Sequence, residues 1–269
     1  EHHVLAQDVS LVCAAGNTTM VHLLLGLPCE NIRREPYIPA AGALPPVRAA
    51  EVGIRIHPRG MLYSLPCVAA FVGGDISAGV LATGIGHNAE TRMLLDIGTN
   101  GEIVIGSKDF LVCASASAGP AFEGAECSCG MRATEGAIDH VRLSGGDGEV
   151  EFSTIGMARP VGICGTGFVD ILAEMLRAGI IDKTGRIHPD ACPARCRGRD
   201  DGEVEFVLVP AGDAANGQDI AVTQTDVQNI LRAKAAIYAA SQVMLSALSM
   251  TFDDITELVV AQRSSAWAD

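Results

Sequence analysis

The fold prediction rests on residues 94–106, which read Leu94-Leu95-Asp96-Ile97-Gly98-Thr99-Asn100-Gly101-Glu102-Ile103-Val104-Ile105-Gly106. Two apolar runs separated by turn-forming residues predict a tight β-hairpin, with Asp96 at the end of its first strand. Asn100-Gly101 is a strong signal for a two-residue turn, because both residue types accept a positive φ.

The turn also has a chemical interpretation. Its small residues would let successive backbone N–H groups point at one anion; they are Gly98, Thr99, Asn100 and Gly101. Asp96, just before the turn, is well placed to hold a hydrated Mg²⁺, which keeps several waters and takes few carboxylates. A surface hairpin with an Asx turn explains the same spacing, so the residues alone leave both interpretations open.

The length, charge and apolar content of the chain exclude some classes of function. A chain of 269 residues can bury a sizeable core and is long enough for two subdomains. Its formal net charge of −13 argues against a nucleic-acid partner, because a groove that neutralises phosphates needs clustered Lys and Arg. A nucleotide held by backbone N–H groups and Mg²⁺ is not excluded. No apolar run is long enough to span a bilayer, so we expect no membrane segment.

The nine cysteines are scattered and include no Cys-x-x-Cys pair. With no signal-type segment before them, they favour a reducing, cytoplasmic location. His188, Cys192 and Cys196 have a loosely metal-like spacing. We interpret them as an incidental loop cluster, because structural zinc normally takes four ligands in tight pairs.

The first part of the chain alternates strands and helices. We expect a strand at residues 9–15, a turn at 16–19, a short helix at 20–25, a proline-rich arm at 28–60 with one strand at 50–56, and a strand at 61–66. Gly73-Gly74-Asp75 then opens a helix of small residues. Asp75 is either a helix cap or a carboxylate that faces a phosphate site and orients water or Mg²⁺.

The second part continues this alternation. We expect a strand at 110–114, a loop entering a short helix at 115–124, hairpin strands across 136–155 around the 145–148 turn, and strands at 203–210, 219–222 and 257–261. Hairpins together with helices predict mixed sheets. Gly165, Thr166 and Gly167 open a helix that runs to Gly179, and its N-terminus is a second candidate for nucleotide contact.

The longest helix is expected from a capping box at residues 225–228 to about residue 250. Its apolar stripe is predicted to contain Val227, Leu231, Tyr238, Leu245 and Leu248. Lys234 falls on the same stripe. Its stem either lies along the apolar surface with the ammonium in water, or its ammonium reaches a nucleotide.

Several motifs follow one another in order: Gly-Asn-Thr-Thr-Met-x-His-Leu-Leu-Leu-Gly at 16–26, Val-Gly-Gly-Asp at 72–75, Leu-Asp-Ile-Gly-Thr-Asn-Gly-Glu at 95–102, Ala-Gly-Pro-Ala-Phe-Glu-Gly at 118–124, Cys-Gly-Met-Arg-Ala at 129–133 and Gly-Ile-Cys-Gly-Thr-Gly at 162–167. This order closely resembles the C-terminal part of the ATP-dependent reductive activators of corrinoid proteins. Those ferredoxin-like proteins belong to the acetate and sugar kinase/Hsp70/actin (ASKHA) superfamily. The resemblance covers about residues 9–260.

The resemblance implies an RNase-H-like α/β fold of the actin/Hsp70/sugar-kinase type, with mixed sheets flanked by helices in two subdomains. Residues 1–91 would be the remainder of the first subdomain with the proline-rich arm, and residues 92–269 the second. ATP and Mg²⁺ would be the cofactors. The second phosphate-binding hairpin would be formed by Asp96, Gly98, Thr99, Asn100, Gly101 and Glu102. Asp75 would occupy the place of the catalytic acidic residue, and the helix with Arg232 and Lys234 would lie beside the adenosine.

Family members use ATP to drive electron transfer from an iron–sulfur cluster to a Co(II) corrinoid on a methyltransferase partner. The sequence departs from that pattern. The cysteines of an N-terminal [2Fe–2S] domain and the first phosphate-binding hairpin are not in this chain. Where the family has Ala-Gly-Gly-Phe-Gly, residues 260–265 read Val-Ala-Gln-Arg-Ser-Ser. We therefore expect a chain truncated at both ends, with the [2Fe–2S] cluster in a domain outside it.

Three functions follow as hypotheses. The first is the ATP-binding, ATPase-like domain of a corrinoid activator, whose partner is the corrinoid protein of a methyltransferase system. The second is the activator ATPase of a 2-hydroxyacyl-CoA dehydratase, whose motifs match less well. The third is a non-catalytic module that docks a corrinoid protein or forms a homodimer.

Overall fold

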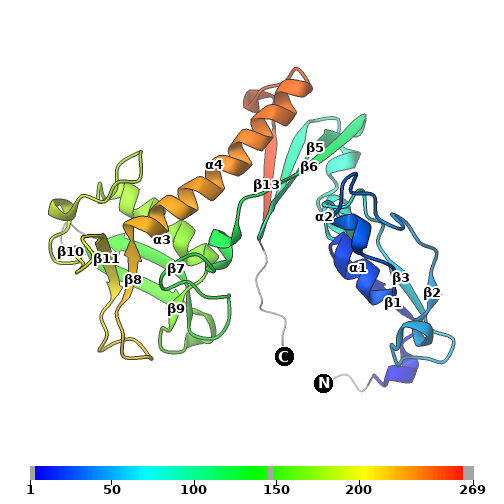
Figure 1. Ribbon diagram of the computed structural model, residues 1–269, viewed down its shortest axis with the longest axis horizontal. Helices are drawn as coiled ribbons and strands as arrows, with labels where there is room; N and C mark the ends of the chain where they lie inside the picture. The colour runs from blue at the N-terminus through cyan, green and yellow to red at the C-terminus, as the bar shows by residue number, and fades with distance from the viewer. Residues whose placement is uncertain (1–3, 145–147, 263–269) are drawn as a thin grey trace. The chain divides into compact units, whose positions relative to one another are not determined.

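The computed structural model describes residues 4–144 and 148–262, and it divides into two compact units (Figure 1). Unit 1 comprises residues 1–96, 102–115 and 242–261, and unit 2 comprises residues 97–101, 116–241 and 262–269. Both contain sheets with helices packed against them, which confirms the mixed α/β fold class. The domain boundary expected between residues 91 and 92 stays a prediction.

The first sheet of unit 1 has the strand order β1-β3-β2. β1 (Leu11–Ala14) is parallel to β3 (Met61–Ser64), and β2 (Val47–Arg48) is antiparallel to β3. Helix α1 (Thr18–Leu24) follows β1, where the Asn17 side chain accepts a hydrogen bond from the Met20 N–H at 2.9 Å and caps the helix.

The strand expected at residues 50–56 is wrong. Residues Ala49–Val52 form a 3₁₀ turn that ends at Gly53, whose φ of 78° lies in the left-handed region. The sequence Ala-Ala-Glu-Val has no alternation of apolar and polar residues, and a left-handed glycine ends an extended run. The only strand that the structure describes within the proline-rich arm, residues 28–60, is the short β2.

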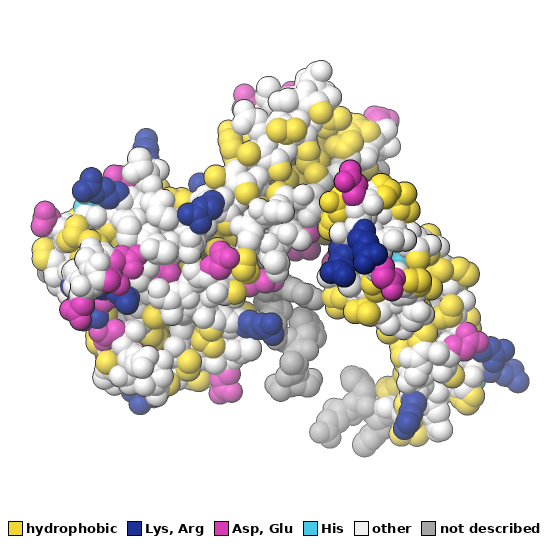
Figure 2. Space-filling view, viewed as in Figure 1, with side chains coloured by type: hydrophobic (Ala, Val, Ile, Leu, Met, Phe, Trp, Pro, Cys, Tyr) yellow, Lys and Arg dark blue, Asp and Glu magenta, His cyan; other side chains and the backbone are white. Residues whose placement is uncertain are grey.

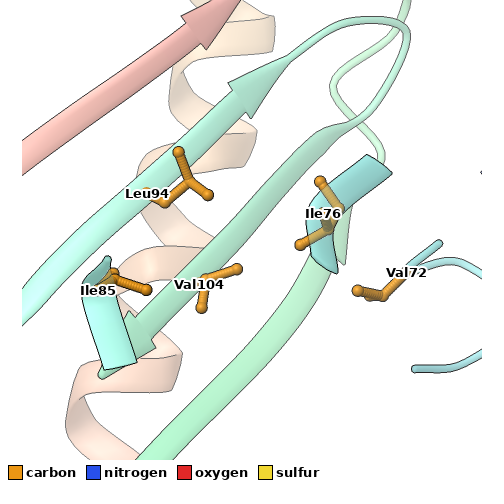
Figure 3. Packing of buried hydrophobic residues seen from close by; sticks show 5 residues of the cluster. All are labelled: Val72, Ile76, Ile85, Leu94 and Val104. Atoms are coloured by element: carbon orange, nitrogen blue, oxygen red, sulfur yellow. The ribbon is translucent and has the colours of Figure 1, made fainter. Parts of the chain in front are cut away.

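The second sheet of unit 1 carries the hairpin, with the strand order β13-β4-β5-β6. Its strands are β4 (Arg92–Ile97), β5 (Gly101–Ser107), β6 (Phe110–Ala116) and β13 (Glu257–Gln262). Helix α2 (Gly74–Thr83) covers one face. There Ile76 and Ile85 pack with Val72 against Leu94 and Val104 (Figure 3). This apolar layer fixes the strands that hold Asp96 and Glu102.

Unit 2 contains two smaller sheets. In the first, β7 (Ala137–Ser144) is antiparallel to β8 (Glu149–Thr154) and parallel to β9 (Gly162–Ile163), and α3 (Gly165–Arg177) packs on β7. The turn expected between β7 and β8 lies outside the described residues except for Gly148. The second sheet is antiparallel throughout, with β10 (Cys196–Gly198), β11 (Val204–Val209) and β12 (Ile220–Thr223).

Helix α4 (Gln224–Ala247) begins two residues earlier than the capping box at 225–228 predicts. Thr223 Oγ1 accepts a hydrogen bond from the Asp226 N–H at 3.1 Å, and Asp226 Oδ2 accepts one from the Thr223 N–H at 2.9 Å. This reciprocal pair is a capping box at 223–226. The expected box is wrong because Thr223, two residues earlier, caps the helix by accepting from the Asp226 N–H.

The apolar stripe of α4 is only partly as predicted. Val227 and Leu245 are buried, but Tyr238 is 54% exposed and Lys234 is also exposed. The buried face instead follows three- and four-residue steps through Val227, Ile230, Ala233, Ile237, Ser241 and Leu245. Small Ala233 and Ser241 belong to this face, which an inventory of large apolar residues misses.

Short 3₁₀ segments connect the elements. They are Ala6–Asp8, Glu30–Ile32, Ala49–Val52, Ile85–His87, Pro120–Glu123 (η5), Ile155–Met157, Pro189–Ala191 and Phe252–Asp254. Among the described residues, no helix combines the length and the apolar character needed to cross a membrane.

Candidate functional site

The turn of the hairpin consists of Gly98, Thr99 and Asn100, between the end of β4 at Ile97 and the start of β5 at Gly101. The Gly98 N–H donates a hydrogen bond to the Asn100 carbonyl oxygen at 2.9 Å. The hairpin is confirmed, but its expected backbone geometry is wrong, because neither Asn100 nor Gly101 has a positive φ. Gly101 is required for space instead: a Cβ there would lie 2.5 Å from Ile237 Cγ1 of α4.

Asp75 lies in the first turn of α2, where two glycines allow close approach. A Cβ on Gly73 would overlap the backbone of Asn17, and one on Gly74 would lie 2.7 Å from the Leu65 carbonyl oxygen. The Asp75 N–H donates to the Gly16 carbonyl oxygen at 3.2 Å, and its Oδ1 accepts from the Ile76 N–H at 3.0 Å. The helix cap is Gly73, so Asp75 is a first-turn carboxylate that the helix dipole favours.

Glu102 at the start of β5 is half-buried and accepts a hydrogen bond from Ser115 Oγ at 3.0 Å. Burial raises the pKa of Glu102 above its usual 4.5; the Ser115 hydrogen bond opposes this, and the negative charges of Asp96 and Asp75 add to it. Asp75 and Asp96 therefore lie close enough to Glu102 within unit 1 to repel its carboxylate. We call these three residues the acidic cluster.

The acidic cluster favours a cation, because bringing like charges together costs free energy that a positive ion removes. Among the described residues, no group of three His, Cys, Asp or Glu side chains is arranged as a complete metal site. The three carboxylates of the acidic cluster are therefore not arranged to coordinate one metal ion directly. A Mg²⁺ that keeps its waters needs few carboxylates and fits this donor set.

Glu123, in the segment Pro120–Glu123, is a polar neighbour of the hairpin turn that the sequence did not assign to the site. Thr99 Oγ1 donates a hydrogen bond to Glu123 Oε2 at 2.6 Å, across 24 residues of chain. Ser115, the partner of Glu102, was also missed. The only signal for both was their position in the loop at 115–124, whose small residues suggested close packing or ligand approach.

The N-terminus of α3 holds the other predicted glycines. Gly165 and Gly167 are buried while Thr166 is exposed, and a Cβ on Gly167 would overlap the Ile138 carbonyl oxygen of β7. Cys164 Sγ lies 3.1 Å from Thr166 Oγ1. Close packing of α3 on β7 thus explains Gly167, and contact of Gly165, Thr166 and Gly167 with a nucleotide stays a prediction.

Lys234 lies on α4, three residues before Ile237, which contacts Gly101. Its side chain is exposed, which agrees with an ammonium in water and leaves both interpretations of Lys234 as predictions. Nearby, Arg232 Nη1 donates to Asn229 Oδ1 at 3.1 Å. A role for Lys234 in binding a nucleotide stays a prediction.

The His188, Cys192 and Cys196 loop is packed into unit 2. His188 Nε2 is 3.1 Å from Asp182 Oδ2, and both cysteines are buried. Burial, and then the neighbouring Cys192, raise the pKa of Cys196 to about 11. Such a thiol stays protonated at neutral pH, which suits a small apolar packing residue.

Unit 2 also has a cavity of about 370 Å³ lined by charged side chains. Arg197 pairs with Glu205 at 2.7 Å and with Asp219 at 2.6 Å, and Arg199 pairs with Glu205 at 3.1 Å. Both arginines are therefore already paired with carboxylates of the same unit. This cavity is a poor candidate for binding an anionic phosphate.

Two family models match the chain. Residues 90–265 match the C-terminal domain of RACo, the ASKHA domain, and residues 1–88 match the RACo middle region.

Relatives agree with these matches. The chain is 35% identical over 269 residues to corrinoid activation enzyme RamQ from Eubacterium limosum, an alignment that covers 98% of this chain and 45% of the relative. It is 28% identical over 224 residues to the [Co(II) methylated amine-specific corrinoid protein] reductase of Methanosarcina barkeri, covering 76% of this chain and 37% of that protein.

A solved structure is also similar. It is a reductive activator for corrinoid, iron-sulfur protein, with a TM-score of 0.85 and 46% sequence identity over 96% of this chain and 41% of that one. The chain therefore spans less than half the length of the relatives it matches.

Proposed function

The chain belongs to the RACo family, and from this membership we propose that it is the nucleotide-binding part of a reductive activator that uses ATP to drive reduction of a Co(II) corrinoid protein. The family models favour this class of activator over that of the 2-hydroxyacyl-CoA dehydratases. The observation that carries the proposal is the acidic cluster, two of whose members, Asp96 and Glu102, flank the turn of small residues in the sequence of the ASKHA-type hairpin. That combination pairs a cation site with a phosphate site.

Each residue has a proposed task. The backbone N–H groups of Gly98–Gly101 and the Thr99 hydroxyl would hold phosphate oxygens, and Asp96 would hold Mg²⁺ through its waters. Asp75 would accept a proton from, or orient, the attacking water. Bound Mg²⁺ would neutralise charge on the phosphates. Hydrolysis would then depend on positioning and charge stabilisation rather than on a covalent step.

The electron-transfer step would need more than this chain. We propose that the [2Fe–2S] cluster belongs to a domain outside this chain, and that ATP drives the uphill electron transfer through a change in conformation. The corrinoid protein of a methyltransferase system would be the partner, in the cytoplasm, with a homodimer as the proposed assembly. The proposal predicts no contact with nucleic acid, in line with the net charge of −13.

A non-catalytic docking module is the second candidate. It is favoured by apolar side chains that are exposed in unit 1, including Leu11 at 54%, Leu23 at 68% and Ile38 at 62%. Hydrophobic side chains are visible at the surface over this part of the chain in Figure 2. Clustered exposed apolar residues are typical of interaction surfaces.

Calorimetric titration with Mg-ATP tests the nucleotide site. We expect the chain to bind, and Asp96→Ala to weaken binding roughly tenfold or more, because a charge-assisted contact to the hydrated cation is lost. Asp109→Ala is the matched control. It removes an exposed aspartate from the turn at the other end of β5 and should bind as the wild type does.

The result would contradict the proposal if Asp96→Ala bound Mg-ATP as tightly as the wild type. If no variant bound, the docking module would be the better interpretation. The redox role is tested with the full-length protein mixed with a Co(II) corrinoid protein, a reductant and ATP, by following the Co(I) absorption spectrum. Equal Co(I) formation without ATP would disprove the coupling.

A further inference from the structure

Glu123 ends a short 3₁₀ segment whose backbone is closely packed. The segment η5 (Pro120–Glu123) lies between Gly119 and Gly124, both with a φ of 76°. Ala121 and Phe122 are buried at 1% and 7% exposure, so they anchor the turn in unit 2. A Cβ on Gly124 would lie 2.5 Å from the Met131 N atom. Close packing thus holds the backbone around Glu123.

The Glu123 carboxylate lies against the hairpin turn. Its Oε2 accepts the 2.6 Å hydrogen bond from Thr99 Oγ1, and its Oε1 lies 3.7 Å from the position that a Cβ on Gly98 would take. A threonine hydroxyl has a single hydrogen to donate. In this arrangement that hydrogen is given to Glu123.

A phosphate at this turn would meet two obstacles. The Thr99 hydroxyl cannot donate to a phosphate oxygen while it donates to Glu123. The carboxylate would also lie beside a second anion, and two negative charges a few ångströms apart repel each other. Both obstacles disappear if the Glu123 side chain turns away.

We propose that Glu123 is an internal competitor of the nucleotide: in the nucleotide-free chain its carboxylate takes the place of a phosphate oxygen on Thr99, and nucleotide binding must displace it. This inference rests on the proposed function, because it concerns the same turn. It adds a residue that lowers nucleotide affinity and so helps to release the nucleotide. The competition is an exchange of hydrogen-bond acceptors with no covalent step.

Calorimetric titration of Mg-ATP into Glu123→Gln and Glu123→Ala tests the inference. We expect both variants to bind about tenfold more tightly than the wild type, since a charge-assisted hydrogen bond no longer has to be broken. Glu126→Gln is the matched control, because Glu126 is an exposed glutamate on the same loop. It should leave the affinity unchanged.

Two further readouts separate competition from a structural effect. The gain in Glu123→Gln should shrink as the ionic strength rises from about 0.05 M to about 0.5 M, because salt screens the repulsion. The gain should also be smaller in a Thr99→Val background, where no hydroxyl remains to compete for. Glu123→Gln keeps the shape of the side chain, so it should fold even if the alanine variant does not.

Each outcome is informative. If Glu123→Gln bound Mg-ATP as the wild type does, or more weakly, while the wild type bound, the inference alone would be overturned. A glutamate that supports the bound cation would give the weaker binding. If neither the wild type nor the Glu123 variants bound, the proposed nucleotide site itself would fail, and the inference with it.

Discussion

Both units contain clustered carboxylates, but Glu205 of unit 2 is paired with arginines, whereas Glu102 of unit 1 is repelled by neighbouring carboxylates. In unit 2 the Glu205 side chain is 5% exposed, and both of its oxygens pair with arginines, at 2.7 Å to Arg197 and 3.1 Å to Arg199. In unit 1 Glu102 has Ser115 as its hydrogen-bonding side chain and is repelled by Asp96 and Asp75. Across residues 4–144 and 148–262, no Lys or Arg lies within 4.0 Å of the Asp75 or Glu102 carboxylates.

This difference separates a structural cluster from a candidate binding cluster. Charges that cancel within the fold stabilise it and leave nothing for a ligand, as over β10 and β11, where Figure 2 shows Lys or Arg beside Asp or Glu. Charges that repel one another destabilise the fold, so their clustering is best explained by a cation that completes the site. We therefore interpret the Glu205 cluster as structural and the acidic cluster as functional.

The largest effect is expected at Asp75. In Asp75→Asn the full-length protein should lose roughly 100-fold in the rate of ATP hydrolysis, because a carboxylate that orients water becomes a neutral amide. Mg-ATP affinity should change little, and steady-state kinetics should show the loss in kcat rather than in KM. An unchanged kcat would remove Asp75 from the proposed chemistry.

Substitution of Glu205 should lower the stability of the fold and leave the nucleotide site unchanged. Glu205→Gln leaves two half-exposed arginines without their shared carboxylate, and we expect the free energy of unfolding to fall by about 2 kcal/mol. Urea unfolding measures this change. Mg-ATP affinity should stay at the wild-type value; a loss of affinity in a folded variant would break the distinction between the clusters.

The smallest effect concerns Glu102 and pH. Its raised pKa means that the folded state holds the proton more tightly than the unfolded chain. The contribution of Glu102 to the free energy of unfolding should therefore fall as the pH rises above about 4.5, the pKa of this side chain in the unfolded chain. It should level off above the pKa of Glu102 in the folded state. Glu102→Gln mimics the protonated form.

The comparison is made by urea unfolding at two pH values. Glu102→Gln should gain stability over the wild type by less than about 1 kcal/mol at pH 8, and by less still at pH 5. A larger advantage at pH 5 than at pH 8 would mean that the folded pKa is lowered instead. The negative charges of the acidic cluster would then be neutralised by neighbouring groups of the fold, as the charge of Glu205 is by its arginines.

The sequence was most informative where local rules apply. The hairpin, the glycine-led starts of α2 and α3, and most strands follow from apolar runs bounded by turn residues. The ordered motifs also led to the correct family. The acidic cluster could be anticipated in part, because Asp96 and Glu102 flank one turn in the sequence.

Long-range contacts could not be predicted from one sequence. Thr99 and Glu123 are 24 residues apart, and no local rule pairs a threonine with a glutamate at that distance. Gly101 was assigned to backbone freedom, yet the structure explains it by the approach of Ile237. The buried face of α4 depends on which neighbours cover it, which is a property of the tertiary fold rather than of the helix.

Electron paramagnetic resonance of Mn²⁺ tests the central claim most directly, because Mn²⁺ is a paramagnetic substitute for hydrated Mg²⁺. With ATP present, the account predicts a protein-bound Mn²⁺ signal for the wild type and Glu205→Gln, and loss of that signal for Asp96→Asn. An unchanged bound signal in Asp96→Asn, or its loss in folded Glu205→Gln alone, would contradict the assignment of the acidic cluster as the cation site.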